Sequence, residues 1–149
     1  MSFTKLTYHI VFATKNRMQT ITAEHERELY AMIHHIINKN GGYLHRINGM
    51  PDHVHILVDL PPTIAVATFI QAVKRESSAM MSNSVAKFPN WVGWQEGYGC
   101  FSYSAADIPK IKNYIINQKT HHKTISFVEE YRNWLIEMGV SPEAPYFPK

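Results

Sequence analysis

Residues 50–58 read Met-Pro-Asp-His-Val-His-Ile-Leu-Val, and this stretch decides both the fold and the candidate site. Pro51 and Asp52 are turn residues, and the apolar, β-branched run that follows them is typical of a strand. Side chains two apart on a strand project to the same face, so we expect His53 and His55 to stand side by side. Two neutral imidazoles at this spacing can bind one divalent cation, and a cation makes a nearby phosphate more electrophilic.

The histidine pair alone does not decide the function. The chain has 9 His in 149 residues, so a His-x-His spacing arises easily by chance. Considered by itself, the pattern is better explained by two histidines on a polar sheet face, bonded to backbone or water.

A second pair of residues, Tyr114 and Gln118, lies further along the chain. They are four apart in a segment with helical periodicity and therefore share one helix face. A phenol is a competent nucleophile toward phosphorus, and a carboxamide oxygen suits the coordination of Mg²⁺ or Mn²⁺ beside imidazoles. Taken singly, Tyr114 is better explained as a core or boundary aromatic, and Gln118 as a solvent-facing helix residue.

Composition places the chain among folded proteins with a sizeable core. Hydrophobic residues make up 45% and charged residues 18%, as in folded proteins, and the length of 149 residues predicts one domain over residues 1–149. The formal net charge of +3 is compatible with a polyanionic partner. A single cysteine, Cys100, excludes an internal disulfide and a Cys-based zinc cluster. We expect a cytoplasmic protein with no membrane association, because no long apolar span and no signal-peptide pattern is present.

The order of predicted elements defines the fold class. The sequence predicts strands at 6–14, 43–48 and 53–58, and a strand or irregular hairpin at 91–104. It predicts helices at 22–40, 64–82, 108–122 and 127–138, the last within a C-terminal helix and tail at 126–149. The order βαββαβ followed by extra helices is an α+β, ferredoxin-like plan with an antiparallel sheet.

Four stretches carry a resemblance to a known family: YHIVFATK at residues 8–15, MPDHVHILV at 50–58, WQEGYGCFSYS at 94–104 and IKNYIINQKTHH at 111–122. Together they are similar to the single-tyrosine transposases of the HUH endonuclease superfamily. These are the compact transposases of bacterial insertion sequences and their repeat-associated relatives. The resemblance covers most of the chain, and no motif position departs from the family pattern.

The resemblance implies an HUH endonuclease fold, a substrate and a mechanism. Such enzymes bind single-stranded DNA, often beside a hairpin at the end of the element. Their tyrosine attacks the scissile phosphate, forms a 5′-phosphotyrosine and releases a 3′-hydroxyl. Transferred to this sequence, Tyr114 is the nucleophile, and His53, His55 and Gln118 hold Mg²⁺ or Mn²⁺. The family also forms homodimers in which one subunit's tyrosine helix serves the other subunit's histidine pair.

Basic residues are the candidates for contacts with the DNA backbone: Lys15, Arg17, Lys74, Arg75, Lys112, Lys119 and Lys123. We expect His121 and His122 to be ordinary residues at a helix end. An alternative function is a non-cleaving single-stranded DNA-binding or regulatory protein derived from such an enzyme. A covalent protein–DNA adduct separates the two functions.

Overall fold

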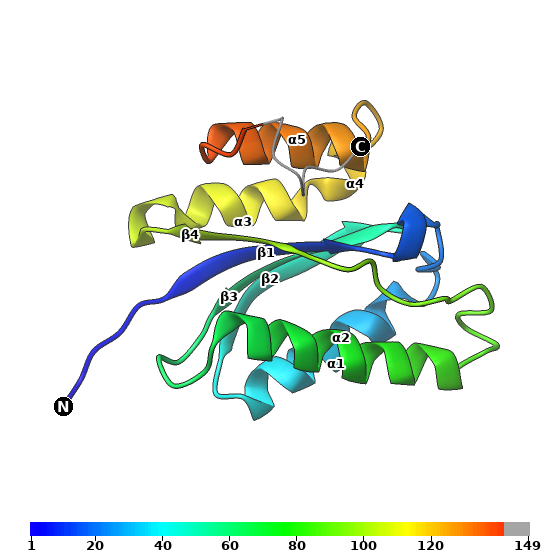
Figure 1. The fold of residues 1–149 in the computed structure, drawn as a ribbon, viewed down its shortest axis with the longest axis horizontal. Helices are drawn as coiled ribbons and strands as arrows, with labels where there is room; N and C mark the ends of the chain where they lie inside the picture. Colours follow the sequence, from blue (N-terminus) through cyan, green and yellow to red (C-terminus); the bar gives the residue numbers. More distant parts are fainter. Residues whose placement is uncertain (142–149) are drawn as a thin grey trace.

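The fold has a four-stranded antiparallel sheet between two layers of helices (Figure 1). In this computed structural model, residues 1–141 are described. The strands β1 (Thr7–Ala13), β2 (Tyr43–Met50), β3 (His53–Asp59) and β4 (Gly99–Tyr103) lie in the order β2-β3-β1-β4. The chain order βαββαβ and this strand order confirm the ferredoxin-like α+β plan.

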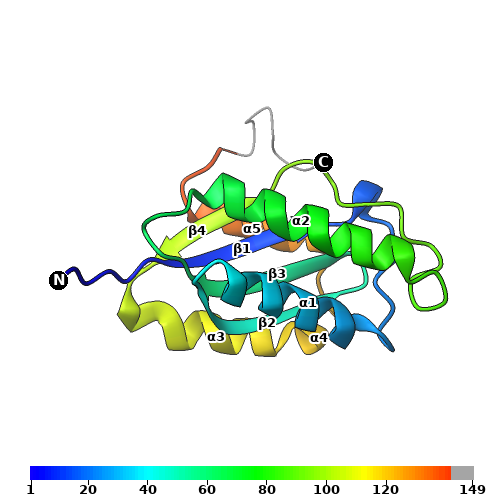
Figure 2. The same cartoon turned by 90° about the horizontal axis from the view of Figure 1, so that it is seen from below.

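One face of the sheet holds the main core. Helices α1 (Glu26–Lys39) and α2 (Val66–Asn83) run side by side across this face (Figure 2). Alternate residues of the two central strands, β1 and β3, point toward these helices, as the period of two in a strand requires. They are fully or almost fully buried: Ile10, Phe12, Val54, Ile56 and Val58.

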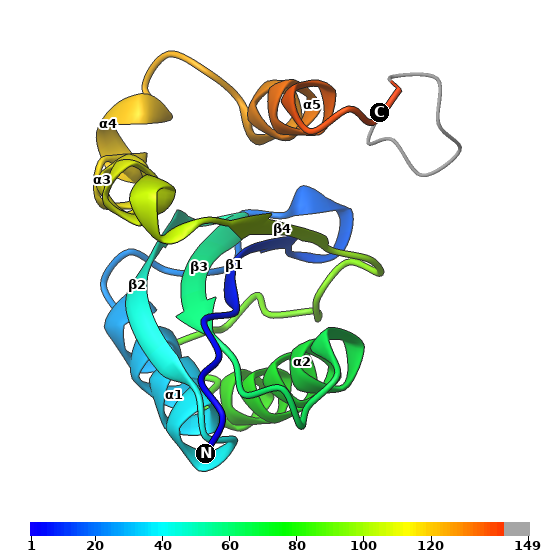
Figure 3. The ribbon, with the colours of Figure 1, turned by 90° about the vertical axis from the view of Figure 1, so that its left-hand side faces the viewer.

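The residues between them point to the opposite face, where the candidate site lies. In the antiparallel register, Val11 pairs with His55 and Ala13 pairs with His53. Helices α3 (Ile108–Ile116), α4 (Gln118–His121) and α5 (Phe127–Glu137) lie over this face, with α5 beside α3 and α4 when the molecule is viewed end-on (Figure 3). The sheet therefore separates the main core, which it forms with α1 and α2, from α3, the helix that carries Tyr114.

The prediction of one continuous helix over 108–122 is wrong. The chain breaks at Asn117, whose φ of −91° and ψ of 15° interrupt the helix between α3 and α4. The reason is a contact with the sheet: the Asn48 side chain of β2 donates hydrogen bonds to the carbonyls of Ile115 (3.0 Å) and Ile116 (3.2 Å). These carbonyls would otherwise continue the helical ladder.

Two other boundaries differ from the prediction by more than two residues. The first helix begins at Glu26 rather than near Thr22, because the Thr22 hydroxyl donates to the Lys87 carbonyl at 3.0 Å instead of capping a helix. Only Gly99–Tyr103 of the predicted 91–104 element forms a strand, after an irregular loop. The last helix is confirmed at Phe127–Glu137, while residues 142–149 of the predicted C-terminal tail lie outside the described residues. Among the described helices, none is long and apolar enough to cross a membrane.

Candidate functional site

The histidine pair stands side by side on β3, as the strand period predicts. Both side chains are completely buried, and their ring centroids are 5.1 Å apart at an angle of 76°. The two-residue turn of Pro51 and Asp52 orients the first ring, because the Asp52 carboxylate lies 2.7 Å from Nδ1 of His53. This contact leaves Nε2 of His53 facing the helices of the site.

The structure brings Tyr114 and Gln118 to the same histidines within one chain. Helix α3 packs Ile111 and Ile115 against the sheet, so that Tyr114, three residues after Ile111, faces the centre of the site. Gln118 is completely buried, and its Oε1 lies 3.3 Å from Nε2 of His53. The break at Asn117 does not separate the two residues, since both contact a common partner on α5.

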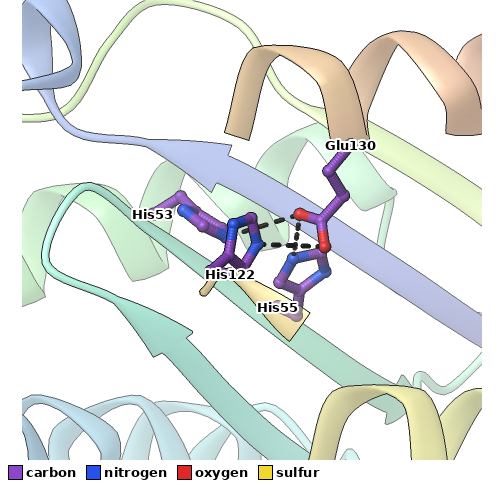
Figure 4. A group of neighbouring side chains, drawn as sticks. All are labelled: His53, His55, His122 and Glu130. Carbon is purple, nitrogen blue, oxygen red and sulfur yellow. Dashed lines mark hydrogen bonds and ion pairs between the residues drawn. The ribbon is translucent and has the colours of Figure 1, made fainter. Parts of the chain in front are cut away.

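That partner is Glu130, which sequence reasoning did not identify. Its side chain is 1% exposed, and its Oε1 lies 2.8 Å from Nε2 of His55 and 3.4 Å from Nε2 of His53. Its Oε2 accepts hydrogen bonds from the Tyr114 hydroxyl and, at 2.9 Å, from Nε2 of Gln118. Figure 4 shows the Glu130 carboxylate beside the two histidines. Because the same carboxylate also accepts the hydrogen bond of Tyr114, it joins the histidines to the tyrosine.

Aromatic packing holds Glu130 in this position. On the same face of α5, the Phe127 ring stacks on the His53 ring at 4.4 Å, and the Trp134 ring meets the Tyr114 ring edge-on at 5.2 Å. The spacing of Phe127, Glu130 and Trp134 places all three on one stripe of the helix. A glutamate in the middle of an apolar helix stripe is the feature of the sequence that could have identified Glu130 as a site residue.

The two adjacent histidines at the end of α4, His121 and His122, belong to the site rather than to an ordinary helix end. Nε2 of His122 lies 3.1 Å from Oε2 of Glu130, and its ring centroid is 4.6 Å from that of His53 (Figure 4). Nε2 of His121 lies 3.2 Å from the Tyr114 hydroxyl. The chain after Gln118 therefore folds back over the histidine pair.

Burial and charge set the protonation states of the site. Burial lowers the pKa of His55 to about 4, so that this imidazole is neutral at pH 7. Burial alone would also lower the pKa of His53, but the carboxylates of Asp52 and Glu130 outweigh it and raise that pKa. Burial would raise the pKa of Glu130, yet the imidazoles around it lower the pKa and keep it ionised.

The Tyr114 phenol is protonated in this arrangement. Burial raises its pKa well above the ordinary value, and the negative charge of Glu130 raises the pKa further. A positive charge beside the carboxylate would oppose the rise in the Tyr114 pKa that the charge of Glu130 causes. The pKa of this phenol is thus sensitive to whether a cation is bound next to it.

The donor set fits a divalent cation. One ligand atom from each of His53, His55, His122 and Glu130 lies within 4.8 Å of the other three. Neutral imidazoles with a carboxylate and an amide oxygen are ligands that Mn²⁺ and related cations accept. The expected ligand Gln118 lies at the edge of this group, with its amide bonded to Glu130.

A cleft of about 370 Å³ opens beside the tyrosine, between α3 and α5. Tyr103 and Trp134 contribute aromatic walls, Lys110 and Asn133 contribute polar groups, and Tyr114 lies on its lining. This volume is in the range of small-ligand sites, about 300–1,000 Å³. The cleft gives a substrate a route to the hydroxyl.

The basic residues predicted to contact DNA do not form one surface. Lys74 and Arg75 lie on α2, across the sheet from Tyr114 (Figure 1), and Lys74 already donates to the carbonyls of Gln95 (2.9 Å) and Gly97 (2.6 Å). Those on the tyrosine side are Lys112, Lys119 and Lys123, while Lys15 and Arg17 follow the end of β1. Lys119 is engaged by Glu26 at 2.8 Å, Asn48 at 3.1 Å and the Gly49 carbonyl.

The comparison with protein families identifies the chain. A family model described as "Transposase IS200 like" matches residues 2–118. The chain belongs to the IS200-like transposase family. This finding confirms the resemblance found in the sequence and makes the chain a transposase, an enzyme of DNA strand transfer. The match includes His53, His55, Tyr114 and Gln118, whereas Glu130 lies beyond it.

Individual relatives agree with this assignment. The transposase is 28% identical over 120 residues to the transposase for insertion sequence element IS200 of Salmonella typhimurium, covering 78% of each chain. It is 29% identical over 118 residues to the ISDra2 transposase TnpA of Deinococcus radiodurans, covering 76% of this chain and 84% of that one.

Two solved structures share the fold. A crystal structure of a Deinococcus radiodurans protein described as a transposase superposes with a TM-score of 0.61 at 33% identity, covering 78% of this chain and 93% of the other. A REP-associated tyrosine transposase bound to a REP hairpin gives a TM-score of 0.63 at 14% identity, covering 100% and 92%. At that identity the second likeness concerns the fold alone.

Proposed function

We propose that this transposase cleaves and rejoins single-stranded DNA at the ends of an insertion sequence, with Tyr114 as the nucleophile. The observation that carries the proposal is the convergence of Tyr114, His53 and His55 on the single carboxylate of Glu130. A nucleophile and a cation site that meet at one buried group can act on one phosphate.

The proposed metal ligands are His53, His55 and Gln118, with Glu130 as a further donor. Oε1 of Glu130 lies on the side of the two imidazoles and Oε2 lies on the side of the phenol. A bound Mg²⁺ or Mn²⁺ would supply positive charge that neutralises a phosphate oxygen and stabilises the transition state.

The residues of the chain account for the remaining chemistry. The Tyr114 hydroxyl gives its proton to Oε2 of Glu130, and its oxygen attacks the scissile phosphorus. The bond between phosphorus and the 3′ oxygen breaks, and that oxygen takes up a proton from solvent to become a 3′-hydroxyl. The 5′-phosphotyrosine keeps the energy of the phosphodiester, so that attack by a 3′-hydroxyl rejoins a strand and frees Tyr114.

Single-stranded DNA suits the cleft beside Tyr114. An unpaired nucleotide can enter it without the cost of opening a duplex, and the Trp134 and Tyr103 rings in its walls can contact a base. The REP-associated transposase of similar fold is bound to a hairpin, and we propose hairpin-bearing ends as the substrate of this chain. The exposed basic residues Lys15, Arg17, Lys112 and Lys123 are the proposed contacts with phosphates, and Arg75 would serve a more distant part of the DNA.

A covalent adduct tests this function against the non-cleaving alternative. The probe is a set of overlapping, labelled single-stranded oligonucleotides that cover the DNA flanking the coding region, incubated with the full chain and Mn²⁺. We expect a slower band in a denaturing gel with the native protein and with the control Tyr98→Phe, whose side chain is 40% exposed. We expect none with Tyr114→Phe. DNA binding without an adduct in the native protein would favour the regulatory alternative.

A homodimer with shared sites remains a prediction. The single chain already places its own Tyr114 beside its own His53 and His55, which supports cleavage in cis from the arrangement described here. Co-expression of Tyr114→Phe with His53→Ala distinguishes the two placements. A shared site restores activity at about a quarter of the sites of a randomly mixed two-fold dimer, whereas a site within one chain leaves only background.

A further inference from the structure

A third buried histidine, His9, lies behind the histidine pair. It is completely buried on β1, and its Nε2 lies 2.7 Å from Nδ1 of His55. The two rings stack at 5.0 Å with an angle of 20°. His9 is diagonal to His55 in the β1–β3 register, which pairs His9 with Leu57 and Val11 with His55. His55 is therefore bonded at both ring nitrogens, to His9 and to Glu130.

The contact between the two rings holds one hydrogen. Two ring nitrogens 2.7 Å apart share a hydrogen that one donates and the other accepts, and a neutral imidazole carries a single N–H. If His9 donates from Nε2, the hydrogen of His55 is on Nε2 and points at Glu130. If His55 donates from Nδ1, its Nε2 is bare and has a lone pair for a cation. The hydrogen of His9 is then on Nδ1.

We propose that His9 is a positioning residue for His55. When a divalent cation binds, His9 accepts a hydrogen bond from Nδ1 of His55. This bond fixes the tautomer in which Nε2 of His55 is a ligand. This inference rests on the proposed metal site. Partners of this kind orient a ligating histidine and raise the basicity of its other nitrogen. Without a cation, the Glu130 carboxylate favours the opposite arrangement, because it accepts the Nε2–H of His55.

The surroundings of His9 allow both arrangements. Its Nδ1 has no hydrogen-bond partner among the described residues. The neighbouring rings on this side are those of Trp134, whose centroid is 5.0 Å away, Phe101, at 6.1 Å, and Tyr103, at 6.4 Å. No bond at Nδ1 therefore locks His9 in one tautomer, and the pair can exchange its hydrogens without a change in net charge. Cation binding at Nε2 of His55 selects the arrangement.

The direct test is the tautomeric state of the full chain in solution. Two-bond ¹H–¹⁵N correlation spectra of ¹⁵N-histidine-labelled protein show which ring nitrogen carries hydrogen, with and without the diamagnetic ion Mg²⁺. We expect His9 and His55 to be Nε2–H without Mg²⁺ and Nδ1–H with it. Mg²⁺ binding with an unchanged His55 tautomer would overturn the role of His9 alone. Spectra of His53 and His55 that do not respond to Mg²⁺ at all would overturn the metal site and this inference together.

Variants give a second readout through metal affinity measured by calorimetry. His9→Phe keeps a ring but cannot accept the hydrogen bond, and we expect Mn²⁺ affinity to fall about 10–100-fold. His9→Gln supplies an amide oxygen at a similar reach and should recover most of the loss. The matched control is His45→Phe, which removes an imidazole that pairs with Asp59 at 2.9 Å, away from the site. Equal affinities in His9→Phe, His45→Phe and the native protein would overturn the proposal.

Discussion

Replacing Glu130 by glutamine tests the role assigned to the residue at the centre of the site. Glu130→Gln keeps the size of the side chain and removes its charge. The buried carboxylate lies 2.8 Å from Nε2 of His55 and 3.4 Å from Nε2 of His53, so a cation held by these two rings would also contact it. We therefore expect the variant to bind Mn²⁺ more weakly.

The magnitude follows from the linkage between binding and stability. Loss of a ligand's charge should weaken Mn²⁺ binding by about 100-fold, the upper end of the effect known for residues that support metal ligands. At an Mn²⁺ concentration about 100 times the native dissociation constant, the native protein gains about 2.7 kcal/mol and the variant about 0.4 kcal/mol. For a chain of this size, each kcal/mol moves Tm by about 2–4 °C, so the Mn²⁺-induced rise in Tm should shrink by about 5–9 °C.

Thermal unfolding with EDTA and with Mn²⁺ measures this difference and separates it from any direct effect of the variant on folding. The control is Glu129→Gln, which removes the same charge from the preceding, exposed position. It should keep the full Mn²⁺-induced rise. If Glu130→Gln also kept the full rise, the carboxylate would not contact the cation, and the ligands would be reduced to His53, His55 and Gln118.

Three further predictions concern the ligands, the DNA and the sheet. Calorimetry should show that His53→Ala and His55→Ala abolish Mn²⁺ binding. Gln118→Ala should weaken Mn²⁺ binding less, because water can replace an amide oxygen. Unchanged Mn²⁺ affinity in His55→Ala would contradict the metal site. Affinity for single-stranded DNA should fall steeply between about 50 and 200 mM salt, by as much as about 10³-fold if six or more phosphates are contacted, and a flat response would count against a DNA partner. Partial burial would raise the pKa of Asp59, but the three side-chain hydrogen bonds that this carboxylate accepts lower the pKa. The ionised carboxylate therefore stabilises the fold at neutral pH, and this stabilisation is lost as pH falls through the pKa of Asp59 in the folded protein. Denaturation of Asp59→Asn should therefore show a loss of stability at pH 7 that shrinks as pH falls below about 4; a loss independent of pH would refute the ionic origin.

The sequence predicted the parts of this structure that depend on local pattern. The alternation in residues 53–58 and the turn before them defined β3, and with it the shared face of His53 and His55. The order of strands and helices was enough to define the ferredoxin-like plan. These features follow from the period of side chains along a strand and from turn chemistry, which a single sequence displays directly.

The parts that were missed depend on contacts between distant segments. Glu130 meets His55 across 75 residues of sequence, and no local pattern specifies that pairing. The break at Asn117 results from the side chain of Asn48 on β2, which lies 67 residues before Ile115, the first carbonyl it binds. His9 was part of a recognisable stretch, but its contact with His55 requires the register between β1 and β3.

The central claim is that Tyr114 carries the DNA during strand transfer, and mass spectrometry of the trapped adduct tests it most directly. The full chain is incubated with Mn²⁺ and a cleaved oligonucleotide, denatured, and digested with protease and nuclease. The account predicts a single modified peptide that contains Tyr114, with a nucleotide joined through its 5′-phosphate to the phenolic oxygen. A nucleotide on another tyrosine, or cleaved DNA with no modified peptide, would contradict it.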